Sequence, residues 1–201
     1  NDGKPLRLLL VGVYYEATLA YATSLRRWLR REDRITATTF ERLRAEDRGS
    51  LESSDALLTF AHRLPELEEM APGRPIVTFD LIPSRQTRIA LAALEPRARL
   101  AVVAVAGFLP TLRRSVDRFA SHVGEVVPLT FEEAFGADLE AVDVVIYGTG
   151  CEAILDELPG GVQALEYRHE PDPAYVERAL LPLLARLRRS SGSMPDGEFT
   201  G

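Results

Sequence analysis

Four short segments of this chain combine glycine, aromatic or histidine residues at points where an apolar run ends. They are Gly12-Val13-Tyr14-Tyr15-Glu16, Phe60-Ala61-His62-Arg63, Ala106-Gly107-Phe108 and Gly148-Thr149-Gly150-Cys151. Glycine lets backbone N–H groups approach a ligand, and a helix that starts just beyond offers unpaired N–H groups to an anion. Aromatic rings can stack on a flat ligand or pack in the core, and glycine also permits a tight turn. Their coincidence after several strands favours a small-molecule pocket.

The candidate ligand-binding residues lie in these segments, with one more in the segment that joins the two halves of the chain. They are Gly12, Tyr14, Tyr15, Phe60, His62, Ser84, Gly107, Phe108, Gly148, Thr149 and Gly150. The Gly148 segment lacks the third glycine of a dinucleotide fingerprint and the Lys-Ser/Thr pair of a P-loop, so nucleotide binding has little support. His62 has no second metal ligand at a useful spacing. We expect neither a metal nor a cofactor.

Cys151, the single cysteine, is the strongest candidate for a nucleophile. It is expected at the start of a helix, where a thiolate is stabilised. Two-lobed enzymes of the aspartate/glutamate racemase type use one cysteine per lobe, but the matching position in the first half is Arg63. A one-cysteine enzyme similar to a decarboxylase of that superfamily stays an alternative. The main expectation is that the chain is not an enzyme and has no catalytic residues.

Composition narrows the class of protein. The chain has 201 residues, of which 46% are hydrophobic and 27% charged, as in a globular protein. It contains no run of ~18 apolar residues, so we expect no membrane span. The net charge of −6 argues against a broad nucleic-acid-binding face in this segment.

One pattern of residues is written twice, in the same order. Residues 7–13 (RLLLVGV) recur as 99–105 (RLAVVAV), residues 39–41 (TFE) as 130–132, and residues 55–59 (DALLT) as 143–147 (DVVIY). Continuous apolar runs indicate strands buried on both faces, as in a parallel sheet. The predicted strands are 6–13, 35–38, 56–60, 76–79, 100–105, 126–129 and 164–167. A helix over 110–121 starts at Pro110, and Thr130 with Glu133 fits a capping box.

These elements predict an α/β fold of two pseudo-symmetric Rossmann-like lobes, with parallel sheets and an interlobe cleft, as in periplasmic binding proteins. Lobe 1 is expected over 6–83 and lobe 2 over 98–168, joined by 84–97, where Ser84 would cap a helix. A helix over 172–189, capped by Asp172 and kinked at Pro182, is expected to return to lobe 1. Residues 190–201 are expected to form a loose tail.

The chain resembles the effector-binding domain of a bacterial GntR-type transcription regulator, in the branch whose sensor is similar to a small periplasmic-binding-protein fold. The residues that carry the likeness are 8–12 (LLLVG), 55–62 (DALLTFAH), 83–84 (PS), 91–94 (LAAL), 99–103 (RLAVV) and 143–147 (DVVIY). The resemblance implies a small-molecule effector, a homodimer in the cytoplasm, and DNA binding through an N-terminal winged-helix domain that this sequence does not contain.

Two further expectations follow. A sequence that begins at Asn1 without methionine fits a sensor domain taken from a longer protein. The alternative to a regulator is the solute-binding component of an ABC transporter. For the regulator we expect a small polar or aromatic metabolite as the ligand.

Overall fold

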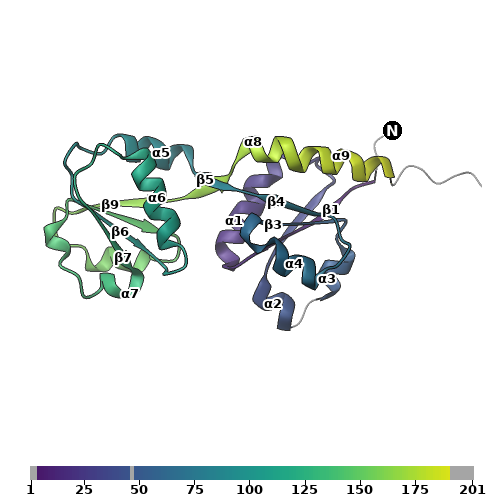
Figure 1. Ribbon diagram of the computed structural model, residues 1–201, viewed down its shortest axis with the longest axis horizontal. Helices are drawn as coiled ribbons and strands as arrows, with labels where there is room; N and C mark the ends of the chain where they lie inside the picture. The colour runs from purple at the N-terminus through teal and green to yellow at the C-terminus, as the bar shows by residue number, and fades with distance from the viewer. Residues whose placement is uncertain (1–3, 46–47, 191–201) are drawn as a thin grey trace, which may run out of the picture. The chain divides into compact units, whose positions relative to one another are not determined.

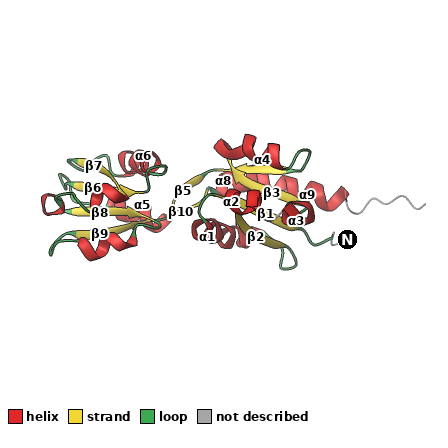
Figure 2. Cartoon of the chain, turned by 90° about the horizontal axis from the view of Figure 1, so that it is seen from below, coloured by secondary structure: helices red, strands yellow, loops and turns green. Residues whose placement is uncertain are grey.

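The computed structural model describes residues 4–45 and 48–190, which form two α/β units (Figure 1). Unit 1 comprises Asn1–Leu81 and Pro171–Gly201, and unit 2 comprises Ile82–Glu170. Each unit contains a four-stranded parallel sheet with helices on both faces (Figure 2). The predicted fold class is therefore confirmed.

The sheet of unit 1 has the strand order β2-β1-β3-β4. Its strands are β1 (Arg7–Gly12), β2 (Arg34–Thr39), β3 (Ala56–Phe60) and β4 (Ile76–Phe79). The helices that follow them in the first half of the chain are α1 (Tyr15–Leu25), α2 (Phe40–Ala45), α3 (Arg48–Ser53) and α4 (Leu64–Met70). Alternate residues of β1 enter different cores, because Leu8 and Leu10 pack on one face while Leu9 and Val11 pack on the other. Two covered faces explain the unbroken apolar run.

Unit 2 repeats this plan with the strand order β7-β6-β8-β9. Its strands are β6 (Leu100–Ala104), β7 (Val126–Thr130), β8 (Val144–Gly148) and β9 (Gln163–Tyr167). Its helices are α5 (Arg85–Ala92), α6 (Leu109–Phe119) and α7 (Phe131–Ala134). Leu100 and Val102 face one core while Ala101 and Val103 face the other. The expected capping box of Thr130 and Glu133 is present at the start of α7.

Equivalent hydrogen bonds support the internal duplication. The Arg7 N–H donates to the Asp55 carboxylate over 2.7 Å, and the Arg99 N–H donates to the Asp143 carboxylate over 2.7 Å. The return bonds, from the Asp55 N–H to the Arg7 carbonyl and from the Asp143 N–H to the Arg99 carbonyl, measure 2.7 and 2.8 Å. The two Arg–Asp pairs of the repeated pattern thus hold adjacent strands together in the same way in both units.

The chain passes between the units twice, through β5 (Leu81–Pro83) and β10 (His169–Pro171), which pair as a two-stranded sheet. Within unit 2 the Ser84 N–H bonds to the Arg168 carbonyl over 2.8 Å, and within unit 1 the Asp172 N–H bonds to the Asp80 carbonyl over 2.9 Å. The two bonds join equivalent positions of the two halves, since the donor positions differ by 172 − 84 = 88 and the acceptor positions by 168 − 80 = 88. Each half of the chain therefore donates its last helix to the other unit.

The segment 84–97 belongs to unit 2. It was predicted to connect the two lobes, but the chain divides at Leu81 and again at Glu170. The helix α5 lies in unit 2, where Leu91 is part of the core that contains Leu100 and Val102. The apolar face of α5 therefore packs in the core of unit 2.

The C-terminal helical segment belongs to unit 1. It consists of α8 (Pro173–Tyr175), a π-helical turn at Val176–Leu180, and α9 (Leu181–Ser190). Val176, Leu180, Leu183 and Leu184 lie in the same buried cluster as the core residues of β1. The predicted interruption of the helix at Pro182 corresponds to this π-helical turn, which ends just before Pro182, a residue without the N–H that an ordinary helical turn uses. Residues 191–201 lie outside the described chain.

Candidate functional site

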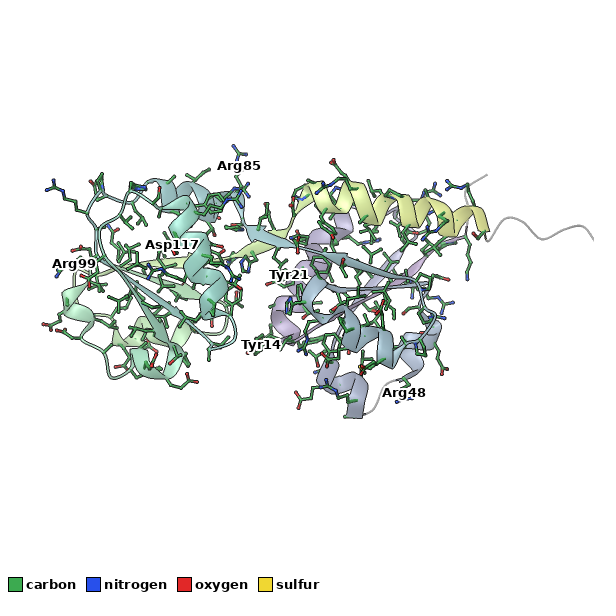
Figure 3. The ribbon with its side chains drawn as sticks, in the orientation of Figure 1. Tyr14, Tyr21, Arg48, Arg85, Arg99 and Asp117 are labelled. Carbon is green, nitrogen blue, oxygen red and sulfur yellow. The ribbon has the colours of Figure 1, made fainter. Side chains whose placement is uncertain are left out.

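Unit 1 has an open depression of about 550 Å³ at the carboxyl ends of β1 and β2. Parallel pairing sets Gly12 beside Thr39, so the segments that follow the two strands meet at one edge of the sheet. Tyr14, Tyr15 and Arg42 line the depression together with Thr39. Figure 3 shows Tyr14 at the amino end of α1. Tyr14 and Tyr15 are 56% and 38% exposed, so both residues are accessible to a ligand.

Arg42 gives this depression hydrogen-bond donors. Its guanidinium carbon lies 4.3 Å from the centre of the Tyr15 ring, in a cation–π contact. Among the described residues no carboxylate forms an ion pair with it, although Glu16 and Glu41 line the same depression. The depression thus combines a guanidinium, carboxylates and tyrosine hydroxyls with exposed aromatic rings. Such a combination can bind a polar ligand that also has an apolar face.

Gly12 has a packing role. A side chain at this position would overlap that of Thr18, whose Cβ would lie 3.0 Å from the added carbon. Thr18 is buried on α1, and its hydroxyl donates to the Tyr14 carbonyl over 2.6 Å. Gly12 therefore lets α1 pack close to the end of β1. This packing positions Tyr14 and Tyr15 at the amino end of the helix. Gly12 is not itself among the residues that line the depression.

Phe60 and His62 belong to an aromatic group at the end of β3. Phe60 packs against Phe79 at a centroid distance of 5.1 Å and against Tyr21 at 6.0 Å, and it joins the core of unit 1. His62 is exposed, and its ring stacks on Phe60 at 5.9 Å with an interplanar angle of 11°. Neither residue lines the Tyr14 depression, so the structure does not bring them into that site.

In unit 2, Phe108 lies over the end of β8. A Cβ added at Gly148 would lie 3.6 Å from the ring of Phe108, which is an ordinary van der Waals contact. Gly107 and Thr149 are exposed. Gly150 adopts a positive φ of 87°, and its N–H donates to the Glu152 carboxylate over 3.0 Å. The Gly150 N–H, expected to face a ligand, is therefore occupied by a side chain of its own loop.

Two residues that the sequence analysis did not select complete this strand end. His169 contacts both Phe108 and Tyr167 edge to face, with centroid distances of 4.7 Å in each case. The Tyr167 hydroxyl and His169 Nε2 are 3.0 Å apart. Burial lowers the pKa of His169 to about 4 and raises the pKa of Tyr167 to about 12, so both are uncharged at neutral pH. The available signal was the repeat, since Tyr167 stands 88 residues after Phe79.

Ser84 is a helix cap. Its hydroxyl oxygen accepts a bond from the Thr87 N–H over 3.2 Å and lies 3.0 Å from the Thr87 hydroxyl. The Ser84 hydroxyl is thus used in starting α5, and the Ser84 N–H donates to the Arg168 carbonyl, so both groups are engaged within the protein.

Cys151 does not lie in a site suited to a thiolate. It is fully buried and precedes a six-residue 3₁₀ turn, Glu152–Glu157, rather than an α-helix. Burial raises the pKa of the thiol, whereas a nucleophilic cysteine needs a lowered one. Its surroundings are those of a core residue packed with Val145 and Ile154.

A larger hollow of about 1030 Å³ lies at the opposite, amino-terminal edge of the unit 2 sheet. Its lining includes Arg97, Asp143, Gly161 and Gln163, none of which the sequence analysis selected. Among residues 4–45 and 48–190, no three histidine, cysteine or acidic side chains cluster as a metal site. No helix in those ranges is both long and apolar enough to cross a membrane.

Comparison with known proteins gives a likeness of fold. No protein-family model matches the sequence, and no curated protein matches it. The chain is similar to the crystal structure of an ABC transporter periplasmic solute binding protein from Actinobacillus succinogenes 130z with bound D-allose. The TM-score is 0.51 at 10% sequence identity, over 98% of this chain and 96% of that chain. The likeness is therefore one of architecture.

Proposed function

We propose that this chain binds a small molecule at the carboxyl ends of its parallel strands, as the solute-binding component of an ABC transporter. The observation that carries the proposal is the shared two-unit fold, whose structural neighbour is a solute-binding protein holding D-allose. Exposed aromatic residues at the strand ends of unit 1 and a half-buried aromatic group at those of unit 2 support the same position for the ligand.

The side chains favour a compact, hydrogen-bonding ligand with an apolar face. In unit 1 the depression has rings from Tyr14 and Tyr15 and donors from Arg42. In unit 2 Phe108 supplies an aromatic ring and His169 supplies an imidazole. Sugars, amino acids and nucleobases all combine flat apolar surface with polar edges, so they form the first panel to test.

The second candidate is the effector-binding domain of a GntR-type regulator. It is favoured by the segments 55–62, 83–84 and 91–94, which resemble that family. A regulator uses the same strand-end site differently, because ligand binding must favour one conformation by about 5 kcal/mol to switch it almost completely. An upstream winged-helix sequence in the full-length gene favours the regulator, and a signal sequence favours the transporter.

The test is a thermal-shift screen of sugars, amino acids, nucleobases and organic acids, followed by isothermal titration of each compound that raises the unfolding midpoint. Tyr15→Ala and Phe108→Ala each remove a ring at a strand end, in unit 1 and unit 2 respectively, and the variant in the unit that holds the best compound is expected to weaken its binding at least tenfold. Ile89→Ala, which removes a 59% exposed apolar side chain from α5, is the matched control and should bind normally. A folded protein that binds nothing in the panel contradicts the proposal.

A further inference from the structure

The depression of unit 1 contains charged groups of both signs that do not pair with one another. Arg42 contributes a guanidinium, and Glu16 and Glu41 contribute carboxylates. Among the described residues no basic side chain forms an ion pair with either glutamate, and no acidic side chain forms one with Arg42. One cation and two anions are therefore available to a ligand in the same depression.

Two contacts position Arg42 beside the strand ends of unit 1. Its backbone N–H donates to the hydroxyl of Thr39 over 3.3 Å, and Thr39, which is buried, is the last residue of β2. Its guanidinium lies over the Tyr15 ring. Within the part of the chain that the structure describes, the guanidinium N–H groups have no hydrogen-bond acceptor. A guanidinium held in this way presents a fork of donors that matches the two oxygens of a carboxylate.

This set of charges selects among ligand classes. An anion would pair with Arg42 but would also approach two carboxylates, and a cation would pair with the carboxylates but would also approach Arg42. A ligand with both a carboxylate and an ammonium group pairs with both signs. The volume of about 550 Å³ is in the range of small-molecule sites, roughly 300–1,000 Å³. The exposed rings of Tyr14 and Tyr15 add apolar surface beside the charges.

Resting on the proposed function, we propose that the depression of unit 1 binds a free α-amino acid with an aromatic side chain. Arg42 pairs with the carboxylate of the amino acid. Glu16 and Glu41 pair with its ammonium group, and the rings of Tyr14 and Tyr15 contact its side chain.

Helix stabilisation is the competing explanation for the two glutamates. Glu16 lies in the first turn of α1 and Glu41 in the first turn of α2, where a negative charge stabilises a helix. That explanation predicts that glutamine at both positions lowers stability and leaves ligand affinity unchanged. The amino-acid site predicts a loss of affinity that depends on whether the ligand carries an ammonium group.

The experiment is isothermal titration at pH 7 with three related compounds: L-phenylalanine, hydrocinnamate, which lacks the ammonium group, and phenethylamine, which lacks the carboxylate. Wild-type protein should bind L-phenylalanine at least about tenfold more tightly than either analogue, because each analogue loses a charge-assisted hydrogen bond. Arg42→Gln should weaken L-phenylalanine about tenfold or more without weakening phenethylamine. The double variant Glu16→Gln/Glu41→Gln should weaken L-phenylalanine to a similar extent without weakening hydrocinnamate.

Matched controls come from charged residues of unit 1 that do not line the depression. Arg44→Gln changes an arginine of α2 that pairs with Glu66, and Glu52→Gln changes an exposed glutamate of α3. Both variants should bind L-phenylalanine as the wild type does. Damage to the fold would weaken all three compounds together, so a loss confined to the compounds that carry one charged group identifies the pairing.

Two results would overturn the amino-acid site: no binding of L-phenylalanine to folded wild-type protein, or equal L-phenylalanine affinity in wild type, Arg42→Gln and the double glutamine variant. These outcomes differ from failure of the proposed function. If sugars or nucleobases bind and Tyr15→Ala weakens them while L-phenylalanine does not bind, only the amino-acid site is wrong. If the folded protein binds no compound of the panel, the proposed function is wrong as well.

Discussion

Single residues in this chain have roles that their type alone does not reveal. Gly12, Gly148 and Gly150 all follow the same sequence pattern, a glycine at the end of a strand or just after it. Gly12 makes room for Thr18, a Cβ at Gly148 would make only ordinary contact with Phe108, and Gly150 is the one of the three with a positive φ. The sequence shows only that each strand end carries a glycine. It could not separate a packing role from a ligand-binding one, because that depends on the neighbour that fills the space.

Gly12→Ala should destabilise unit 1, because the added methyl group would overlap the buried Thr18 side chain. Overpacking of this kind costs about 1–3 kcal/mol. Urea unfolding of Gly12→Ala and of Gly107→Ala, where nothing lies within 4 Å of the added carbon, measures the effect. Equal stability of the two variants would show that α1 moves freely away from the strand.

Cys151 should be inert in the folded protein. Burial raises the pKa of its thiol and shields the sulfur, so little thiolate is present or accessible at pH 8. Ellman's reagent is expected to react slowly with native protein and at once in 6 M guanidinium. Rapid, stoichiometric labelling of the native protein would restore the cysteine as a candidate nucleophile.

His169 should make stability depend on pH. Its pKa in the folded protein is about 4, below the ordinary value of 6.5, so the unfolded chain takes up a proton that the folded chain cannot. Stability is therefore lost as pH falls from about 6.5 towards 4, by an amount on the order of 2–3 kcal/mol. Urea unfolding at pH 7.5, 6 and 5 should show a steeper loss for wild type than for His169→Phe. Parallel curves would mean that the imidazole titrates normally.

Among the secondary-structure elements, the strands were the most predictable. Residues 8–12 and 100–104 are apolar without interruption because both faces of each sheet are covered, and apolar runs as short as these favour strands over helices. The helices α2 and α3 and the crossing strands β5 and β10 were not predicted. β5 and β10 have three residues each and pair with each other across a long sequence separation, which no local pattern encodes.

The attachment of α9 to unit 1 depends on a buried ion pair. The Asp33 side chain is 1% exposed and pairs with Arg188, and it also accepts bonds from the Leu6 and Arg30 N–H groups over 3.0 Å each. These contacts join the start of the first sheet to the last helix of the chain. The apolar residues of α9 indicate that this helix must pack against a core. Only the structure identifies Asp33 as the residue with which Arg188 of this helix forms its ion pair.

Asp33→Ala should cost about 3–5 kcal/mol, because it leaves the largely buried Arg188 guanidinium without its carboxylate. Asp117→Ala is the control: it breaks an exposed pair with Arg113, where about 0–1 kcal/mol is expected. Denaturation monitored by circular dichroism compares the two. A loss below 1 kcal/mol for Asp33→Ala would mean that the apolar contacts of α9 suffice.

At the scale of the whole molecule, the duplication was the most useful signal in the sequence. The pairs Arg7–Asp55 and Arg99–Asp143 recur in identical roles, and the strand order is the same in both units. The return of the last helix to the first unit was predicted, but the matching placement of α5 in the second unit was not, because the repeated segments of the sequence end before the two helices begin. Extended by the same offset, the repeat pairs Pro83-Ser84 with Pro171-Asp172 and thus predicts both helix starts.

The candidate site could be predicted only in part. Tyr14, Tyr15 and Phe108 lie at strand ends as expected, but Arg42, Tyr167 and His169 were missed. The segment after β2, which contains Arg42, has no glycine, and His169 lies between Arg168 and Glu170, where no apolar run indicates a strand. Both reach the strand ends through parallel register, which a single sequence does not specify.

The most direct test of the account is isothermal titration of the best panel compound into wild-type protein and into the Tyr15→Ala and Phe108→Ala variants. These side chains stand at the strand ends of unit 1 and unit 2 respectively. We predict that the compound binds the wild-type protein, and that the variant in the unit that holds the compound weakens it at least tenfold while remaining folded. Unchanged affinity in both variants would place the ligand elsewhere and contradict a strand-end binding site.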